Sequence, residues 1–141
     1  MSERQVRAAE VVKVLTEARQ IISAPRNWTK GHWRIYDEDK FCPASEEEAY
    51  LVSDKFCSLG AIYRRNPNKI GEIYEPAVEA LASVVPHRFY NSHDKRATVF
   101  SFNDSASTSH EEVLATFDKA IEQQCKIVRE EAEKDDSHLS D

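Results

Sequence analysis

The strongest structural signals lie in one stretch, Thr98-Val-Phe-Ser-Phe-Asn-Asp-Ser-Ala-Ser-Thr-Ser-His-Glu-Glu-Val-Leu-Ala-Thr-Phe-Asp-Lys-Ala-Ile121. Its first part has the β-branched and aromatic character of a strand, in Val99, Phe100 and Phe102. Asn103-Asp104 favours a turn, because both side chains hydrogen-bond to nearby backbone. We therefore predict a strand over 98–103 that ends in a polar turn.

The second part of the stretch predicts a long helix over 109–132. Two overlapping capping boxes mark its start, Thr108-x-x-Glu111 and Ser109-x-x-Glu112. The two glutamates also place negative charge in the first turn, where the helix dipole favours it. Apolar side chains then recur every three or four residues, at Leu114, Phe117, Ile121, Cys125, Val128 and Ala132.

Other segments outward from this stretch complete an α+β prediction. We expect helices over 2–22, 45–63 and 75–85, and a hairpin over 33–42. About four helices would then pack on a small antiparallel sheet formed by the hairpin and the 98–103 strand. The two long helices should contact each other through Leu15, Ala18, Phe117 and Ile121. A homodimer formed through one long helix is the alternative use of such an apolar face.

Composition predicts one soluble domain over 1–132 and an acidic, frayed tail over 133–141. The chain is 40% hydrophobic and 31% charged, as in ordinary globular proteins. Residues 130–141 hold six acids against one lysine, so most of the net charge of −6 belongs to this end. Three cysteines at unrelated spacings indicate neither a disulfide framework nor a zinc site. Since no signal peptide or membrane span is apparent, we expect a cytoplasmic protein without cofactor or metal.

Several reactive side chains have a structural interpretation that is favoured over a functional one. Cys57 lies beside the apolar stripe of its predicted helix, so we expect a buried, inert thiol rather than a nucleophile. The basic loop 64–69 is more typical of a solvated surface than of a phosphate site. His87, His93 and Asp94 lack a second matching cluster and do not predict a metal site.

The candidate site combines Trp28, Asn103, Asp104 and His110. We predict that Trp28 and the Asn103-Asp104 turn are neighbours in space, and that Asp104 accepts backbone amides near Thr108. Asp104 could also orient His110 for acid–base chemistry, with Cys57 or Ser109 as nucleophile. The same residues could equally cap turns and cover the core, and no catalytic role is assigned to them.

Four blocks of sequence, taken together, resemble a known family. They are Trp28-Thr29-x-Gly31, Phe56-Cys57-x-x-Gly60-Ala61-Ile62, Asn103-Asp104 and His110-x-x-Val113-Leu114-x-x-Phe117-Asp118-x-Ala120-Ile121. This order is similar to a small domain family of bacteria and their phages that is catalogued without a known function. Relatives often carry tryptophan where this chain has Phe56 and Phe102, and both replacements keep an aromatic ring. The resemblance implies a bacterial or phage setting and supplies no reaction.

Two functional hypotheses follow. The leading one is a small accessory protein that binds another protein, such as a phage-encoded inhibitor or adaptor of a host factor. It rests on the absence of a complete catalytic or cofactor motif in the sequence. The alternative is a small-molecule or nucleotide-binding domain, including a hydrolase, with its pocket at Trp28, Asn103, Asp104 and His110. Neither hypothesis involves a membrane or a nucleic acid.

Overall fold

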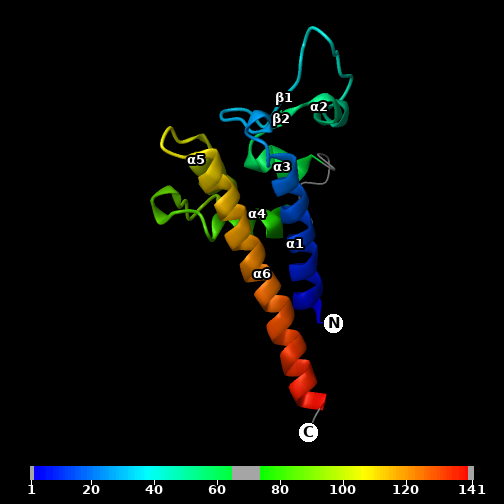
Figure 1. The fold of residues 1–141 in the computed structure, drawn as a ribbon, viewed down its shortest axis with the longest axis vertical. Coiled ribbons are helices and arrows are strands. Elements are labelled where there is room, and N and C mark those ends of the chain that lie inside the picture. The colour runs from blue at the N-terminus through cyan, green and yellow to red at the C-terminus, as the bar shows by residue number, and fades with distance from the viewer. Residues whose placement is uncertain (1, 65–73, 140–141) are drawn as a thin grey trace.

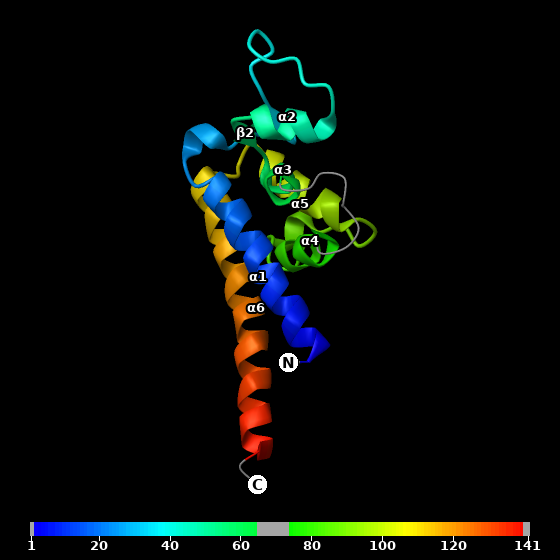
Figure 2. The same ribbon diagram turned by 90° about the vertical axis from the view of Figure 1, so that its right-hand side faces the viewer.

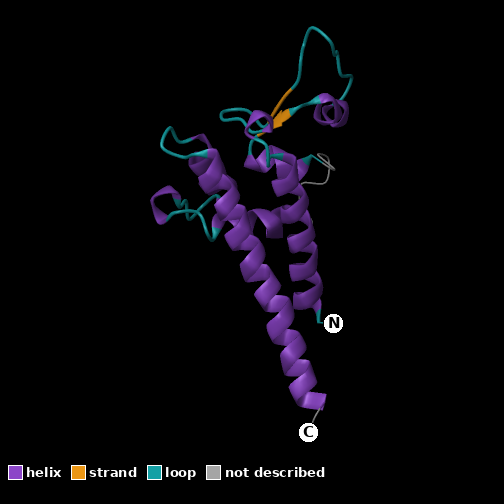
Figure 3. Ribbon diagram, in the orientation of Figure 1, coloured by secondary structure: helices purple, strands orange, loops and turns teal. Residues whose placement is uncertain are grey.

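The fold is mainly helical, with one small antiparallel sheet (Figures 1 and 3). A computed structural model describes residues 2–64 and 74–139, with residues 131–139 described by backbone alone. These residues form an α+β arrangement with six α-helices. The elements are α1 (Glu3–Ile21), η1 (Pro25–Asn27), β1 (Arg34–Ile35), α2 (Glu46–Val52), β2 (Lys55–Phe56), α3 (Ser58–Tyr63), α4 (Tyr74–Ala82), η2 (His87–Phe89), α5 (Lys95–Asp104) and α6 (His110–Leu139).

The two long helices, α1 and α6, lie side by side and run in opposite directions, which confirms the predicted pairing (Figures 1 and 2). Leu15, Ala18 and Phe117 are buried where the helices meet, and Ile121 packs against the same cluster. Polar contacts at both ends fix the register of the pair. Gln5 Nε2 donates to the Val128 carbonyl oxygen at 3.2 Å, and Arg19 pairs with Asp118 at 2.6 Å.

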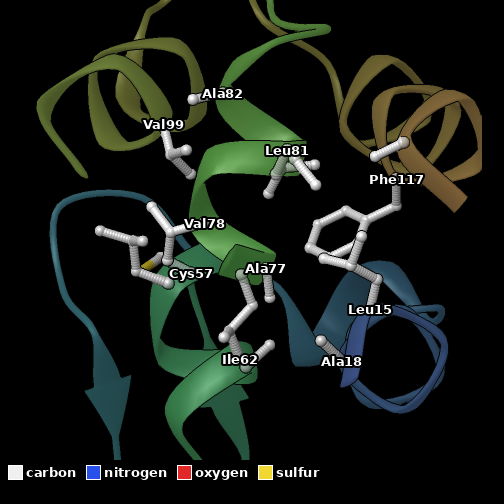
Figure 4. Packing of buried hydrophobic residues seen from close by; sticks show 14 of the residues in the cluster. Leu15, Ala18, Cys57, Ile62, Ala77, Val78, Leu81, Ala82, Val99 and Phe117 are labelled. Carbon is white, nitrogen blue, oxygen red and sulfur yellow. The ribbon is translucent and has the colours of Figure 1, made fainter. Parts of the chain in front are cut away.

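The core surrounds α4, which contacts α1, α3, α5 and α6 (Figure 4). Its buried face carries Ala77, Val78 and Leu81, and alternating small and branched side chains let neighbouring helices approach closely. Phe117 of α6 and Ile62 of α3 reach this face from different sides (Figure 4). A single hydrophobic core therefore joins all the helices that contact α4.

The predicted strand over 98–103 is wrong, because these residues belong to α5. Asp94 caps this helix, and its Oδ1 atom accepts from the amides of Arg96 at 2.9 Å and Ala97 at 3.2 Å. Val99 and Phe102, three residues apart, then face the core, while Phe100 points to solvent. A helical start upstream therefore overrides the strand propensity of the aromatic and β-branched residues.

The predicted helix over 45–63 is also wrong in its middle, where the chain extends into β2. α2 ends at Val52, and the hydroxyl of the capping residue Ser53 donates back to the Ala49 carbonyl oxygen at 2.6 Å. β2 pairs antiparallel with β1, with Arg34 opposite Phe56 and Ile35 opposite Lys55. The hairpin predicted over 33–42 does not form, since Lys40–Cys42 is not a strand and the partner of β1 lies beyond α2. The two-stranded sheet confirms only the antiparallel pairing.

α6 begins as predicted but continues to Leu139, beyond the predicted end at 132. Ser109 and Glu112 form the capping box, with bonds of 3.1 and 3.2 Å. The alternative box is not formed, because the buried Thr108 hydroxyl has no hydrogen-bond partner in the described part of the chain. Residues 65–69 of the predicted basic loop lie outside the described residues. Among the helices described, none has the length and apolarity that a membrane span requires.

The buried tyrosines predict a loss of stability at alkaline pH. Burial raises the pKa of the Tyr50 and Tyr63 phenols above the ordinary value near 10. On unfolding these groups release protons at their ordinary pKa, so above about pH 9 the unfolded state binds fewer protons and the free energy of unfolding falls. Urea titrations between about pH 8 and 10.5 should show this slope.

The variant Tyr63→Phe tests the cause, because within the described residues the buried Tyr63 hydroxyl makes no hydrogen bond of ordinary geometry, although the nearby Arg96 guanidinium opposes the rise of its pKa. Its stability at neutral pH should be close to that of the parent chain, and its alkaline slope should be smaller. An unchanged slope would show that Tyr63 titrates normally in the folded protein.

Candidate functional site

A cluster of hydrogen bonds around Asn103 occupies the centre of the predicted site. The Asn103 side chain is 0% exposed. Its Oδ1 atom accepts from Trp28 Nε1 at 2.8 Å, from the Ser58 amide at 3.1 Å and from Ser58 Oγ at 2.8 Å. Its Nδ2 atom donates to the Thr29 carbonyl oxygen at 3.0 Å and to Asp104 Oδ1 at 2.9 Å. The amide therefore joins three segments of the chain and has no hydrogen-bonding capacity left for a ligand.

The loop after α1 is fixed to the turn between α5 and α6 by two further contacts. Asp104 Oδ1 accepts from the Gly31 amide at 2.9 Å, and Gly31 adopts a positive φ of 80°. The Lys30 ammonium donates to the carbonyl oxygens of Ser105 at 2.5 Å and Thr108 at 2.8 Å. The prediction that Asp104 accepts from amides near Thr108 is therefore wrong. Asp104 accepts from the Gly31 amide instead, and the Lys30 ammonium donates to the carbonyl oxygens of the turn.

His110 contacts Trp28 rather than Asp104. Its Nε2 atom lies 2.6 Å from the Ile22 carbonyl oxygen, which can only accept, so Nε2 carries the proton. The two rings are 5.5 Å apart. In place of the possible Asp104–His110 pair, His110 joins the start of α6 to the end of α1 and contacts the Trp28 ring. Ser109, the alternative nucleophile, accepts a hydrogen bond from the Glu112 amide through its hydroxyl and so serves as the helix cap.

Cys57 is buried beneath this cluster, as predicted. Its Sγ atom accepts from the Gly60 amide at 3.4 Å and caps α3, and the residue is only 2% exposed. Burial raises the pKa of the Cys57 thiol to about 11, and the negative charge of Asp104 acts in the same direction. At neutral pH the sulfur is therefore a protonated, unreactive thiol.

Thiol labelling tests this state of Cys57, with Cys42 as a control in the same chain. Cys42 is exposed, so a maleimide at pH 7.5 should modify it quickly while Cys57 reacts only after unfolding. Mass spectrometry of tryptic peptides at timed intervals separates the two sites. Labelling of native Cys57 at a rate close to that of Cys42 would contradict its burial and restore it as a candidate nucleophile.

The structure thus brings Trp28, Asn103 and Asp104 together, and the predicted proximity of Trp28 to the turn is confirmed. It also adds Gly31, from the Trp28-Thr29-x-Gly31 block, together with Ser58 and Lys30, which no local sequence signal marks because their partners lie 45 or more residues away. Of the three residues His87, His93 and Asp94, which did not predict a metal site, Asp94 caps α5 and His87 stacks on Tyr90. Within the described residues no group of three or more His, Cys, Asp or Glu side chains could hold a metal ion.

Three of the six large apolar side chains that are exposed in the described part of the chain lie elsewhere, on residues 33–54, which we call the arm; the other three, Val6, Tyr90 and Phe100, are spread over separate segments. The arm contains β1, α2 and the loop between them and projects beyond the ends of α1 and α6 (Figures 1 and 2). Trp33, Phe41 and Leu51 are 40%, 42% and 66% exposed. Seven acids against two basic residues give the arm a net charge of −5, and the acids are Asp37, Glu38, Asp39, Glu46, Glu47, Glu48 and Asp54.

The arm is firmly attached at its base. The Cys57 amide donates to the Trp33 carbonyl oxygen at 3.3 Å, and the Asp54 amide donates to the Ile35 carbonyl oxygen at 3.1 Å. Arg34 bonds to both carboxylate oxygens of Glu46, at 2.8 and 3.0 Å, and so ties β1 to α2. The exposed aromatic and acidic side chains therefore lie on a segment whose position is fixed by these hydrogen bonds.

Comparison with known proteins places the chain in a family. The model of the "Family of unknown function (DUF6197)" matches residues 6–123, which include the Asn103 cluster and the arm. No curated protein and no solved structure matches the chain. Since the family model covers well over half of the sequence, the chain belongs to this family of unknown function, DUF6197.

Proposed function

We propose that this protein is a binding module whose arm attaches to a basic surface of a partner protein. The observation that carries the proposal is the combination of exposed apolar side chains and a net charge of −5 on the arm. In the bacterial or phage cytoplasm that the sequence resemblance implies, an inhibitor or adaptor of a host factor is one form of such a module.

The apolar residues supply the binding energy in this proposal. Trp33, Phe41 and Leu51 are large and exposed, and aromatic residues of this kind dominate the energetics of protein interfaces. Lone exposed apolar residues are common on protein surfaces, but several on one projecting segment are a better indication of a contact surface. Because the arm is already attached to the rest of the fold, it loses less conformational entropy when it binds a partner.

The acidic residues supply selectivity for the partner. Glu38, Asp39 and Glu47 are exposed, and none of them forms a side-chain ion pair within the described structure. Their negative potential would steer a basic surface toward the arm and repel an acidic one. The basic partner therefore follows from charge complementarity.

The Asn103 cluster supports the same conclusion by contrast. Its polar atoms bond to each other, and Cys57 is a buried, protonated thiol, so the residues once considered for catalysis are engaged in holding the loop and turn together. A binding function on the arm needs no reaction from them.

Affinity capture with two forms of the chain tests the proposal. The double variant Phe41→Ser/Leu51→Ser removes exposed side chains, so its melting temperature should stay close to that of the parent. We expect the parent to capture a protein from lysate of the source cells that the double variant loses. With this partner purified, titration calorimetry should give an affinity lower by about tenfold or more for the variant.

Charge variants then test the nature of the partner. Neutralising Glu38, Asp39 and Glu47 as Glu38→Gln/Asp39→Asn/Glu47→Gln should slow association and reduce its salt dependence. A matched control neutralises three exposed acids outside the arm, Glu10→Gln/Glu111→Gln/Glu130→Gln. If no captured protein distinguishes the parent from the arm variants, or if the control weakens binding equally, the proposal is wrong.

A further inference from the structure

We infer that a groove between α1, α4 and α6, lined by residues outside the arm, binds a small amphipathic monoanion. The groove has a volume of about 370 Å³. This lies within the roughly 300–1,000 Å³ of small-molecule sites. Its lining residues come from the first half of α1, from α4 and the turn after it, and from α6.

The floor of the groove is apolar and well supported. Ala8 and Val11 of α1 and Ala80 of α4 form it, and all three are buried members of the protein interior. Ile127 of α6 closes the third side and is half-buried. Ala8 and Ala80, on facing helices, leave space that larger side chains would fill, so the small size of these two residues creates the groove.

Charged groups at the rim determine which ligand fits. Arg7 of α1 and Glu79 of α4 line the groove from two helices, and Arg4, which interacts with another group of the chain, lies beside Arg7 at the same rim. The side chains of Arg7 and Glu79 form no ion pair or hydrogen bond with any described residue. An unpaired guanidinium beside an apolar floor favours a carboxylate or sulfonate, because the ion pair is less hydrated there than in bulk water.

The ligand class follows from these three features. A single negative charge pairs with Arg7, an apolar body of aromatic size covers the floor, and one hydrogen-bond donor on that body can bond to Glu79. The site is separate from the arm, so it does not depend on the protein-binding function proposed above. It also differs from the pocket predicted at Trp28, whose polar atoms are already paired.

A fluorescent probe of this class tests the inference directly. 8-Anilinonaphthalene-1-sulfonate is a monoanion with an aromatic body and one N–H donor, and N-phenyl-1-naphthylamine has the same body without the charge. We expect saturable binding of the anion to the native chain at a stoichiometry of about one. Arg7→Gln should weaken this binding about tenfold and change that of the neutral probe little.

Two further variants separate the groove from other surfaces. Ala80→Leu should fill the floor and abolish binding of both probes, whereas Lys13→Gln, on an exposed face of the same helix outside the groove, should leave both unchanged. Circular dichroism confirms that each variant is folded. The inference is overturned if anion binding does not saturate, if it survives both Arg7→Gln and Ala80→Leu, or if Phe41→Ser/Leu51→Ser on the arm removes it.

Discussion

Asn103→Leu is expected to lower the free energy of unfolding by about 3–5 kcal/mol, one of the two largest effects for a single substitution in this chain. Leucine has a similar shape but cannot hydrogen-bond. The substitution would leave the Trp28 indole N–H and both the amide and the hydroxyl of Ser58 without their acceptor. Each buried donor that loses its partner costs about 1–3 kcal/mol, because water cannot replace the bond there.

Urea denaturation followed by circular dichroism at 222 nm measures this effect without relying on the fluorescence of Trp28. Gln123→Leu is the matched control, because it makes the same kind of change at an exposed position of α6 and should alter stability by less than about 0.5 kcal/mol. Asn103→Asp is informative as well. It keeps an acceptor for Trp28 and Ser58 but places a second carboxylate against Asp104, so it should also destabilise the fold. A small loss for Asn103→Leu would mean that the cluster contributes little to folding.

Gly60→Ala is expected to cost about 3 kcal/mol or more, although alanine is the better helix former by about 1 kcal/mol. Gly60 lies in α3 directly against the backbone of Trp33. A Cβ atom at this position would lie 1.7 Å from the Trp33 carbonyl oxygen and 2.6 Å from its carbonyl carbon. Because backbone atoms cannot rotate away, the base of the arm must move and lose the bond from the Cys57 amide to Trp33.

Gly31→Ala separates this steric effect from a conformational one. Gly31 has open space around its Cα but a positive φ of 80°, so alanine there should cost only about 1–2 kcal/mol. Gly31→Asn should cost less than Gly31→Ala, because asparagine tolerates this backbone region better. Thermal melts of the three variants provide the comparison. Equal losses for Gly60→Ala and Gly31→Ala would contradict the proposed clash.

The sequence predicted those parts of the fold that depend on local signals. α1 and α6 have caps and an apolar repeat within their own residues, and their pairing follows from those repeats. α5 was misassigned because Val99, Phe100 and Phe102 suit a strand, while the decisive cap, Asp94, lies upstream in what looked like a loop. The break between α2 and α3 depends on pairing of β2 with β1, about 20 residues earlier in the chain.

The candidate site was predictable only in part for the same reason. Trp28 and Asn103 could be matched because a loop tryptophan and a buried turn residue each need a partner. Ser58 and the Ile22 carbonyl oxygen could not, because their bonds to Asn103 and His110 span 45 and 88 residues and follow from the packed helices. The exposure of the arm could not be predicted from the spacing of its apolar residues, since α2 taken alone has the spacing of a core helix.

The pairing of α1 with α6 has a consequence for synthesis of the chain. Contacts between these helices join residues 99 to 123 positions apart, as in Arg19–Asp118 and Gln5–Val128. α1 leaves the ribosome before α6, so the side of its apolar stripe that faces α6 stays uncovered until α6 is made, although α3 and α4 can already pack on α1. Chaperones that hold nascent chains would therefore meet α1 before its partner exists, and release would follow only once α6 has left the ribosome.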